Sequence, residues 1–441
     1  MKDNRTLWWL SSIYLVWLLA VLFIFGYTPT NDGLGYVEYA QWCLAEGAPY
    51  PTTSIYSHVP FVWNIGIINL TQLSLWLFNS ITPLLVLLCV LKAGTALFTA
   101  LTAQHLFGHR TAIAALLLFV LYPNNWGQST MVSSEIPSTF LCVLAVFLIV
   151  AYGPYGAKSY RAYKSYKPYM LLLVGVLLGL ANWFRPTATI FIVAIAAYLL
   201  LVNRQDAWQR HTARIATFIA GYALFIVVVG TSCYLRTGHF VYQSRSYWFS
   251  MVDECYDGAA VAPHWGQPVW PEGNPRYIEG HEQMDCFQFE QIWKQRSLDY
   301  LKDHKLGYLK KIPGRLFYMY QSDYDNIPFF LEEKADAAEN YITIPFRHLL
   351  TEAGSLSRAQ WLALICLLYY AALLVMAFSG SLRLFRHGCF TQLFLPLFIV
   401  VAGSLALVLV MHGETRFKDP LMPYLIMLSA TAFTTKTSNS Q

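Results

Sequence analysis

A single acidic residue follows the first apolar run of this chain. Asp32 lies in Asn31-Asp32-Gly33-Leu34-Gly35-Tyr36 and leads into an amphipathic stretch that ends near Gly47. A carboxylate at such a position can act as a general base and take the proton of an acceptor hydroxyl. It can also serve only as the N-cap of the helix that follows. His58 begins a second stretch rich in Trp, Asn and Gln, and two such stretches beside one carboxylate favour a site.

Two more ionisable residues lie at the ends of short apolar runs. Glu135 stands in Ser133-Ser134-Glu135-Ile136-Pro137, where it either lines a site or caps the helix that begins there. Arg185 stands in Asn182-Trp183-Phe184-Arg185-Pro186, between two runs of modest length. An arginine so near the apolar region is costly unless it pairs or its side chain reaches the membrane surface. If it is functional, its planar fork suits a phosphate.

The last ionisable cluster lies between two late apolar runs. It reads His412-Gly413-Glu414-Thr415-Arg416-Phe417-Lys418-Asp419-Pro420 and is denser in charge than a helix connection needs. A solvated turn is one interpretation of this cluster. Anion binding by Arg416 and Lys418 is the interpretation that we favour.

Composition indicates what kind of protein positions these residues. The 441 residues are 56% hydrophobic and 12% charged, and their mean hydropathy is +0.41. Apolar runs approach the roughly 17 to 25 residues that a bilayer requires. These properties predict an all-α polytopic membrane protein. The net charge of +5 comes largely from short basic loops, which the positive-inside rule places in the cytoplasm, so no nucleic-acid partner is implied.

The basic loops predict the topology. The first run follows Lys2 and Arg5 and is expected to be a retained span rather than a cleaved signal peptide. About ten spans are predicted, with both termini in the cytoplasm. This topology places Asp32, Glu135 and the Arg416 cluster on the extracytoplasmic side. The predicted runs are 7–25, 82–106, 112–122, 136–152, 170–184, 186–202, 215–235, 361–378, 394–411 and 421–433.

The chain divides into three predicted parts. Residues 1–235 form a transmembrane module whose first outer loop is 27–80, and 358–441 form a C-terminal transmembrane segment. Residues 236–357 form a small outer loop domain. An amphipathic helix near 288–304 is expected there, lying along the membrane surface. Cys255 and Cys286 both fall in this outer part, where an oxidising compartment would permit a disulfide, and the sequence leaves that pairing open.

Motifs that the chain lacks narrow the chemistry. It has neither the Gly-rich phosphate loop of nucleotide-binding enzymes nor the dinucleotide fingerprint. An activated sugar or phosphate is therefore expected to arrive on a lipid, through the bilayer. No cysteine or histidine spacing indicates a metal or another cofactor, although Asp32, Glu135 and His58 could gather a divalent ion once folded.

Taken in order along the chain, several short motifs resemble GT-C membrane glycosyltransferases. Within that superfamily the pattern is similar to the group of protein O-mannosyltransferases and aminoarabinose (lipid A) transferases. The motifs are Asp32 with Tyr36, Ala40 and Gly47; His58-Val59-Pro60; Ser134-Glu135; Gly179-Leu180-Ala181 before Arg185-Pro186; and Arg416-Phe417 before Pro420 and Pro423. The chain departs from the family at Asp32-Gly33, where Asp-Glu is common, and at His58-Val59-Pro60, where His-Pro-Pro is common.

The resemblance implies a GT-C transmembrane bundle that transfers a sugar from a polyprenyl-phosphate donor, with inversion, on the extracytoplasmic face. It makes Asp32 the general base, and the location is expected to be a bacterial inner membrane. Glu135, His58 and Tyr36 would orient acceptor or donor. The donor phosphate would be held by Arg185, Arg416 and Lys418. The acceptor is expected to be a protein, a lipid or a glycan.

Three alternatives stay open from the sequence. An enzyme of the same superfamily could transfer a whole oligosaccharide or polymerise one. A transporter or flippase would also be polytopic, but it should carry paired internal repeats with broken helices, which the sequence does not display. A non-catalytic membrane scaffold would explain the long outer segment and would leave Asp32, Arg185 and Arg416 free to vary.

Overall fold

The computed structural model describes most of the chain, and every regular element in the described part is helical. The described residues are 4–57, 60–152, 167–202, 207–256, 274–324, 326–327, 331, 351, 353–411 and 413–433. No strand occurs within these ranges. The predicted all-helical class is therefore confirmed for the described part of the chain.

The helices follow the apolar runs of the sequence closely and are linked by short 3-10 turns. Those used below are α1 (Arg5–Phe25), α2 (Asn31–Glu46), α3 (Ile65–Phe78), α4 (Thr82–Phe107), α5 (His109–Val120), α6 (Asn124–Gly127), η3 (Gln128–Thr130), α7 (Glu135–Ala151), α8 (Pro168–Phe184), η5 (Pro186–Ala188), α9 (Thr189–Val202), α10 (Trp208–Thr237), α11 (Tyr247–Tyr256), α12 (Cys286–Lys310), α13 (Ile312–Tyr320), α16 (Arg358–Arg386), α17 (Phe390–Val410), η10 (Thr415–Leu421), α18 (Met422–Ala430) and η11 (Thr431–Phe433).

Five of these helices are long and apolar enough to cross a membrane, namely α1, α4, α10, α16 and α17. A sixth candidate is the pair formed by residues 124–130 and α7, which is bent by 119° at its break. The apolar helices α3, α5 and α8 and the η5–α9 segment are shorter than a full span. The structure therefore supports a membrane protein, and the count of about ten spans stays a prediction.

Helix α4 lies at the centre of the bundle and packs along α1, α5 and α7. Its inward face is fully buried and consists of small and aliphatic residues such as Leu88, Ala96 and Ala100. Helices α8 and α10 approach even more closely. A Cβ added at Gly175 would lie 2.1 Å from the carbonyl oxygen of Phe218, and one at Gly221 would lie 2.1 Å from that of Leu172. These glycines allow backbone-to-backbone packing, as small residues commonly do in membranes.

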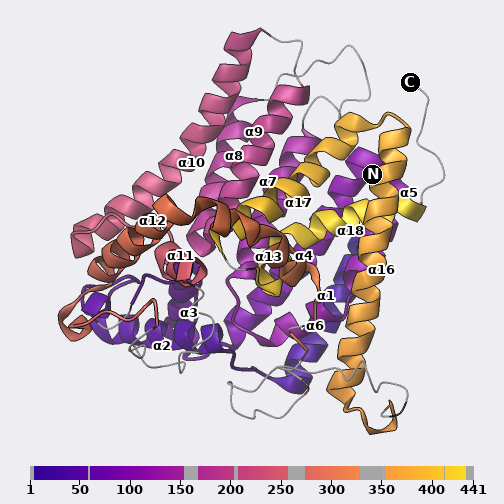
Figure 1. The fold of residues 1–441 in the computed structure, drawn as a ribbon. Helices are drawn as coiled ribbons and strands as arrows, with labels where there is room; N and C mark the ends of the chain where they lie inside the picture. The colour runs from indigo at the N-terminus through magenta and orange to yellow at the C-terminus, as the bar shows by residue number, and fades with distance from the viewer. Residues whose placement is uncertain are drawn as a thin grey trace.

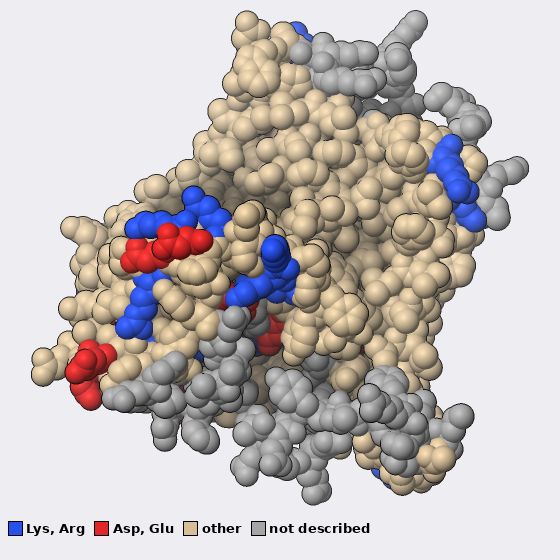
Figure 2. Space-filling view, viewed as in Figure 1, with Lys and Arg blue, Asp and Glu red and all other residues tan. Residues whose placement is uncertain are grey.

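The remaining helices lie across the bundle rather than along it. Helices α2 and α3 lie at the lower end of the bundle in Figure 1, and α11, α12 and α13 cross its front. Charged side chains gather over α12 and around α13, whereas the surface above them is largely uncharged (Figure 2). Helix α13 contacts both α17 and η10. It therefore links the crossing helices α11 to α13 to the last helices of the chain.

Helix α12 covers the predicted amphipathic segment 288–304 and extends beyond it at both ends. Its apolar face is occupied by protein. Phe289 and Trp293 are buried with Val252 of α11 and with Ile278. Cys255 and Cys286 are both free and buried, and they belong to different apolar clusters. The apolar residues Phe289 and Trp293, which recur at helical spacing in α12, therefore pack against α11.

Candidate functional site

Asp32 lies in the first turn of α2 and does not cap it. The N-cap is Thr30, whose Oγ1 accepts a hydrogen bond from the backbone N–H of Gly33 at 3.1 Å. The alternative in which Asp32 serves only as the N-cap is therefore wrong, and its carboxylate is available for other contacts. Gly33 explains the departure from Asp-Glu: an added Cβ would lie 2.7 Å from Thr30 Oγ1 and 3.2 Å from the carbonyl oxygen of Val132.

The partner of Asp32 comes from the far end of the chain. Arg416 Nη1 donates to Asp32 Oδ2 at 2.5 Å. Arg416 Nε lies 2.9 Å from Glu414 Oε1, so one guanidinium faces two carboxylates. The Asp32 side chain is 25% exposed and that of Arg416 is 37% exposed, so this ion pair lies on an open face of the protein.

A second ion pair lies deeper in the protein. Arg185 Nη1 contacts Glu135 Oε1, and both side chains are nearly buried. The other carboxylate oxygen of Glu135 accepts from Ser133 Oγ at 2.8 Å and from Ser134 Oγ at 3.2 Å. Arg185 follows the last residue of α8, where the chain becomes extended before η5. Pairing removes most of the cost of placing this arginine near the apolar region.

Tyr36 connects the two pairs. Its hydroxyl accepts a hydrogen bond from Asn64 Nδ2 at 2.8 Å and lies 3.5 Å from Ser134 Oγ. Asn64 Nδ2 also lies 3.1 Å from Ser134 Oγ. Because Ser134 contacts Arg185 as well, at 3.3 Å, helix α2 and the Glu135 turn share one hydrogen-bond network. The edge of the Tyr36 ring packs against Trp63.

One aromatic ring lies beside both arginines. The guanidinium carbon of Arg185 is 5.7 Å from the centre of the Phe417 ring, and that of Arg416 is 5.9 Å from it. Cation–π attraction acts over such distances. Asp32 and Tyr36 of α2 are therefore brought together with Glu135, Arg185 and Arg416 from four separate parts of the chain.

Lys418 does not join this group, although the sequence predicted that it binds the donor phosphate. Its side chain is fully buried, and Nζ lies 3.2 Å from Asp323 Oδ1. The ammonium also donates to the carbonyl oxygens of Ser322 at 2.7 Å and Thr415 at 3.0 Å. These three contacts take up its hydrogen-bonding capacity. They give Lys418 a structural role, in which it attaches η10 to the segment that follows α13.

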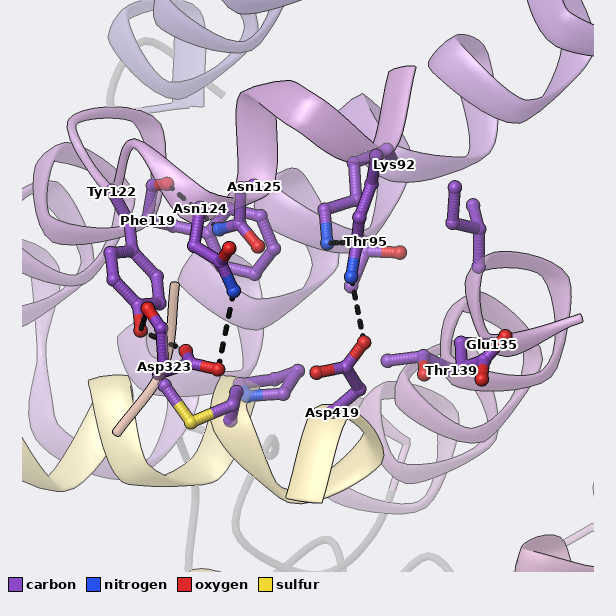
Figure 3. A pocket seen from close by; sticks show the side chains of 14 residues that line it. Lys92, Thr95, Phe119, Tyr122, Asn124, Asn125, Glu135, Thr139, Asp323 and Asp419 are labelled. Carbon is purple, nitrogen blue, oxygen red and sulfur yellow. Dashed lines mark hydrogen bonds between the residues drawn. The ribbon is translucent and has the colours of Figure 1, made fainter. Parts of the chain in front are cut away.

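A polar cavity that the sequence prediction missed lies beside the Glu135 turn (Figure 3). Lys92 of α4 contacts the side-chain oxygen of Gln128, and Gln128 Nε2 donates to Asp419 Oδ2 at 2.7 Å. At the other end of the cavity, Asp323 accepts from Asn124 Nδ2 at 3.2 Å and from Tyr122. Lys92 is the only Asp, Glu, Lys or Arg residue within the run 82–107, and this isolation was the signal available in the sequence.

Burial and neighbouring charges shift the protonation equilibria of the groups outside the spans. Burial acts to lower the pKa of Arg416, but Asp32, Glu414 and Glu135 outweigh it and raise that pKa well above its ordinary value. Burial raises the pKa of the Tyr36 hydroxyl, and the charge of Asp32 adds to the effect. Burial also raises the pKa of Asp419, against the opposing charge of Lys92. Arg416 is therefore a permanent cation, and Tyr36 is a neutral hydrogen-bonding group.

Two further predictions for the site concern His58 and a metal ion. His58 lies outside the described residues, so its predicted orienting role stays a prediction. Within the described ranges, no three His, Cys, Asp or Glu side chains are grouped to hold a metal ion. The roles of Asp32, Glu135, Tyr36, Arg185 and Arg416 also stay predictions, although these residues lie together.

This fold has counterparts among solved structures. It is similar to that of the oligosaccharyltransferase of Archaeoglobus fulgidus in the apo form, with a TM-score of 0.53, 15% identity and coverage of 97% of this chain. The same enzyme tethered by a disulfide bond to an acceptor peptide containing the NVT sequon gives a TM-score of 0.52 and 13% identity over 98% of this chain.

In both comparisons the chain spans only 50% of the length of the archaeal enzyme. No family model matches the sequence, and no curated protein matches it. The likeness therefore establishes a shared fold over nearly the whole of this chain. The particular resemblance to protein O-mannosyltransferases and aminoarabinose transferases stays a prediction from the sequence.

Proposed function

We propose that the protein is an inverting glycosyltransferase that moves a sugar from a polyprenyl-phosphate donor to an acceptor hydroxyl on the extracytoplasmic side of a membrane. The observation that carries this proposal is the open Asp32–Arg416 pair, in which a carboxylate and a permanent cation meet at 2.5 Å. Glycosyl transfer from a lipid phosphate needs both charges at one place: a base for the acceptor and a cation for the leaving group.

In the proposed reaction, Asp32 takes the proton of the acceptor hydroxyl as that oxygen bonds to the anomeric carbon of the sugar. The bond between the anomeric carbon and the phosphate oxygen breaks, and its electron pair leaves with the polyprenyl phosphate. The leaving phosphate is stable as an anion, so it needs no general acid. A single displacement inverts the configuration at the anomeric carbon.

The other residues of the site take supporting roles in this proposal. Arg416 binds the donor phosphate, since its guanidinium is the more exposed of the two near Phe417. Glu135 and Tyr36 orient the sugar or the acceptor through the network around Ser134. Arg185 holds Glu135 in place and adds positive charge near the leaving group.

Replacing Asp32 tests the proposal. Asp32→Asn should abolish transfer, because the amide keeps the shape of the side chain but cannot accept the proton. The measurement is mass spectrometry of lipid-linked glycans and glycoproteins from cells that lack the protein, that carry the wild type or that carry the variant. Glu38→Gln is the matched control: Glu38 lies on the exposed face of the same helix, and we expect this variant to retain full activity. Wild-type activity in Asp32→Asn would overturn the assignment of the base.

A second candidate function is the transfer of a whole oligosaccharide to a peptide. The similarity in fold to an oligosaccharyltransferase that has been tethered to an acceptor peptide favours it. The same mass spectrometry separates the two candidates. Loss of a single-sugar modification in cells without the protein supports the first, and loss of a complete glycan from peptides supports the second.

A further inference from the structure

In the Asp32–Arg416 pair, the proposed base and the proposed phosphate-binding group already bind each other. Arg416 is held on one side by Asp32 at 2.5 Å and on the other by Glu414 at 2.9 Å. Nη1 is already hydrogen-bonded to Asp32, and Nε lies against Glu414, so an arriving phosphate has to compete with two carboxylates for this guanidinium. While Asp32 Oδ2 accepts the hydrogen bond from Arg416, that oxygen faces the guanidinium and is not placed to contact an acceptor hydroxyl.

The surroundings of the two pairs indicate which one is able to open. Glu135 is fixed by Arg185 and by the hydroxyls of Ser133 and Ser134, and it is nearly buried. Breaking that pair would leave a buried charge without compensation. The side chains of Asp32 and Arg416 are 25% and 37% exposed, so water can solvate either group when they separate. The open pair is therefore the one that a ligand can exchange.

We propose that the phosphate of the donor displaces Asp32 from Arg416, so that donor binding itself releases the catalytic base. This inference rests on the proposed function, because it assigns the anion to a polyprenyl phosphate. In one step, Arg416 exchanges the carboxylate of Asp32 for the phosphate, and Asp32 becomes free to accept a proton. The enzyme then binds donor before acceptor, and without donor it holds no free base that water could exploit.

The inference makes an unusual prediction about affinity. Removing the charge of Asp32 should strengthen donor binding, because the phosphate no longer competes with an internal carboxylate. In the wild type, the phosphate has to replace a partly exposed, charge-assisted hydrogen bond between Asp32 and Arg416. Asp32→Asn removes this competitor, so the variant should bind the donor about fivefold tighter or more. Glu414→Gln should also bind more tightly, for the same reason. Arg416→Gln should lose most of the binding.

The experiment is calorimetric titration of the purified full chain with farnesyl phosphate, a short polyprenyl phosphate. Farnesol and inorganic phosphate are titrated in parallel, so that binding of the lipid tail and of a free anion are each measured alone. Glu38→Gln removes the same charge from the exposed face of α2 and should leave the affinity unchanged. In the Arg416→Gln background, Asp32→Asn should give no gain, because the gain requires the arginine.

The outcomes separate this inference from the proposed function. Tighter binding by Asp32→Asn that disappears in the Arg416→Gln background supports the exchange. Equal binding by wild type and Asp32→Asn overturns the exchange and leaves the lipid-phosphate donor intact. If Asp32→Asn fails to fold, as judged by its thermal transition, the same titration of Asp32→Ser, which also removes the carboxylate, decides the exchange. Binding of farnesyl phosphate by none of these proteins overturns both proposals.

Discussion

At the scale of single residues, the Glu135–Arg185 pair is the most constrained part of the site. Both side chains are nearly buried, and three hydroxyl or guanidinium donors converge on one carboxylate. Buried pairs add little net stability compared with an apolar pair of the same volume. Loss of one partner, however, leaves the other as an uncompensated charge near the membrane.

Arg185→Met should therefore destabilise the protein by about 3 to 5 kcal/mol, since it leaves Glu135 buried and unpaired. The double variant Arg185→Met with Glu135→Leu should recover much of that loss. Thermal unfolding in detergent measures both. The control is Lys302→Met, which breaks the fully solvated Lys302–Asp299 pair on α12 and should leave the transition unchanged. Equal transitions for Arg185→Met and wild type would contradict the structural importance of the pair.

The site shows which residues a sequence can reveal. Asp32, Glu135, Arg185 and Arg416 were found because each is a charge beside an apolar run, and such a charge is costly unless it has a use. Lys418 satisfies the same criterion, and its role in phosphate binding stays a prediction, although its side chain is buried beside Asp323. Its partner Asp323 lies in a different segment, and no spacing along the chain connects the two.

At the scale of elements, α13 determines where the Arg416 segment lies. A Cβ added at Gly413 would lie 1.9 Å from the carbonyl oxygen of Arg315, so η10 begins in direct backbone contact with α13. Arg315 in turn pairs with Glu254 of α11 at 2.7 Å and donates to the carbonyl oxygen of Val408 in α17 at 3.2 Å. Helices α11, α13 and α17 therefore meet at Arg315.

Gly413→Ala should slow transfer on the order of a hundredfold, because a methyl group forced against a backbone carbonyl displaces Arg416 by a fraction of an ångström or more. Gly314→Ala is the matched control. It lies in α13 itself, where an added Cβ meets nothing within 4 Å, and it should leave activity unchanged. Initial rates of transfer for the two variants make the comparison. Similar rates would mean that η10 accommodates the methyl group without moving Arg416.

Among the elements, long apolar helices were the most predictable. The runs 7–25 and 82–106 match α1 and α4 to within two residues at each end, because continuous apolar character fixes both the type and the length of a helix. The last predicted span, 421–433, divides into η10, α18 and η11 in the structure. The sequence predicts an amphipathic helix near 288–304 that lies along the membrane surface, but periodicity does not tell whether lipid or another helix covers the apolar face.

At the scale of the whole molecule, the distribution of charge predicts one orientation in the membrane. Charged groups gather over α12 and around α13 (Figure 2), and the short loops that the sequence predicts to be cytoplasmic are rich in basic residues. The fold class was predictable from composition alone. The resemblance placed Asp32, Tyr36, Glu135, Arg185 and Arg416 in one site, but the sequence did not predict which of them pair, because the pairs depend on contacts between α2, α7, the end of α8 and η10 that are up to 384 positions apart.

Cysteine labelling tests this orientation. A cysteine replacing exposed Lys302 should react with a membrane-impermeant maleimide added to intact cells, and one replacing exposed Arg110 should react only after the membrane is opened. Seven of the eight native cysteines are buried, and Cys389→Ser removes the remaining partly exposed one as background. Labelling of Arg110→Cys in intact cells would reverse the predicted topology.

The Asp32–Arg416 contact also bears on how a catalytic cycle ends. In the proposed reaction, Asp32 carries the proton of the acceptor after transfer and no longer attracts Arg416, so the lipid phosphate stays bound to the guanidinium. Once Asp32 loses that proton to water, its carboxylate again competes for Arg416 at close range. We therefore expect the lipid carrier to be released after Asp32 is deprotonated. Recycling of the carrier then depends on proton transfer, and the enzyme does not retain the carrier between turnovers.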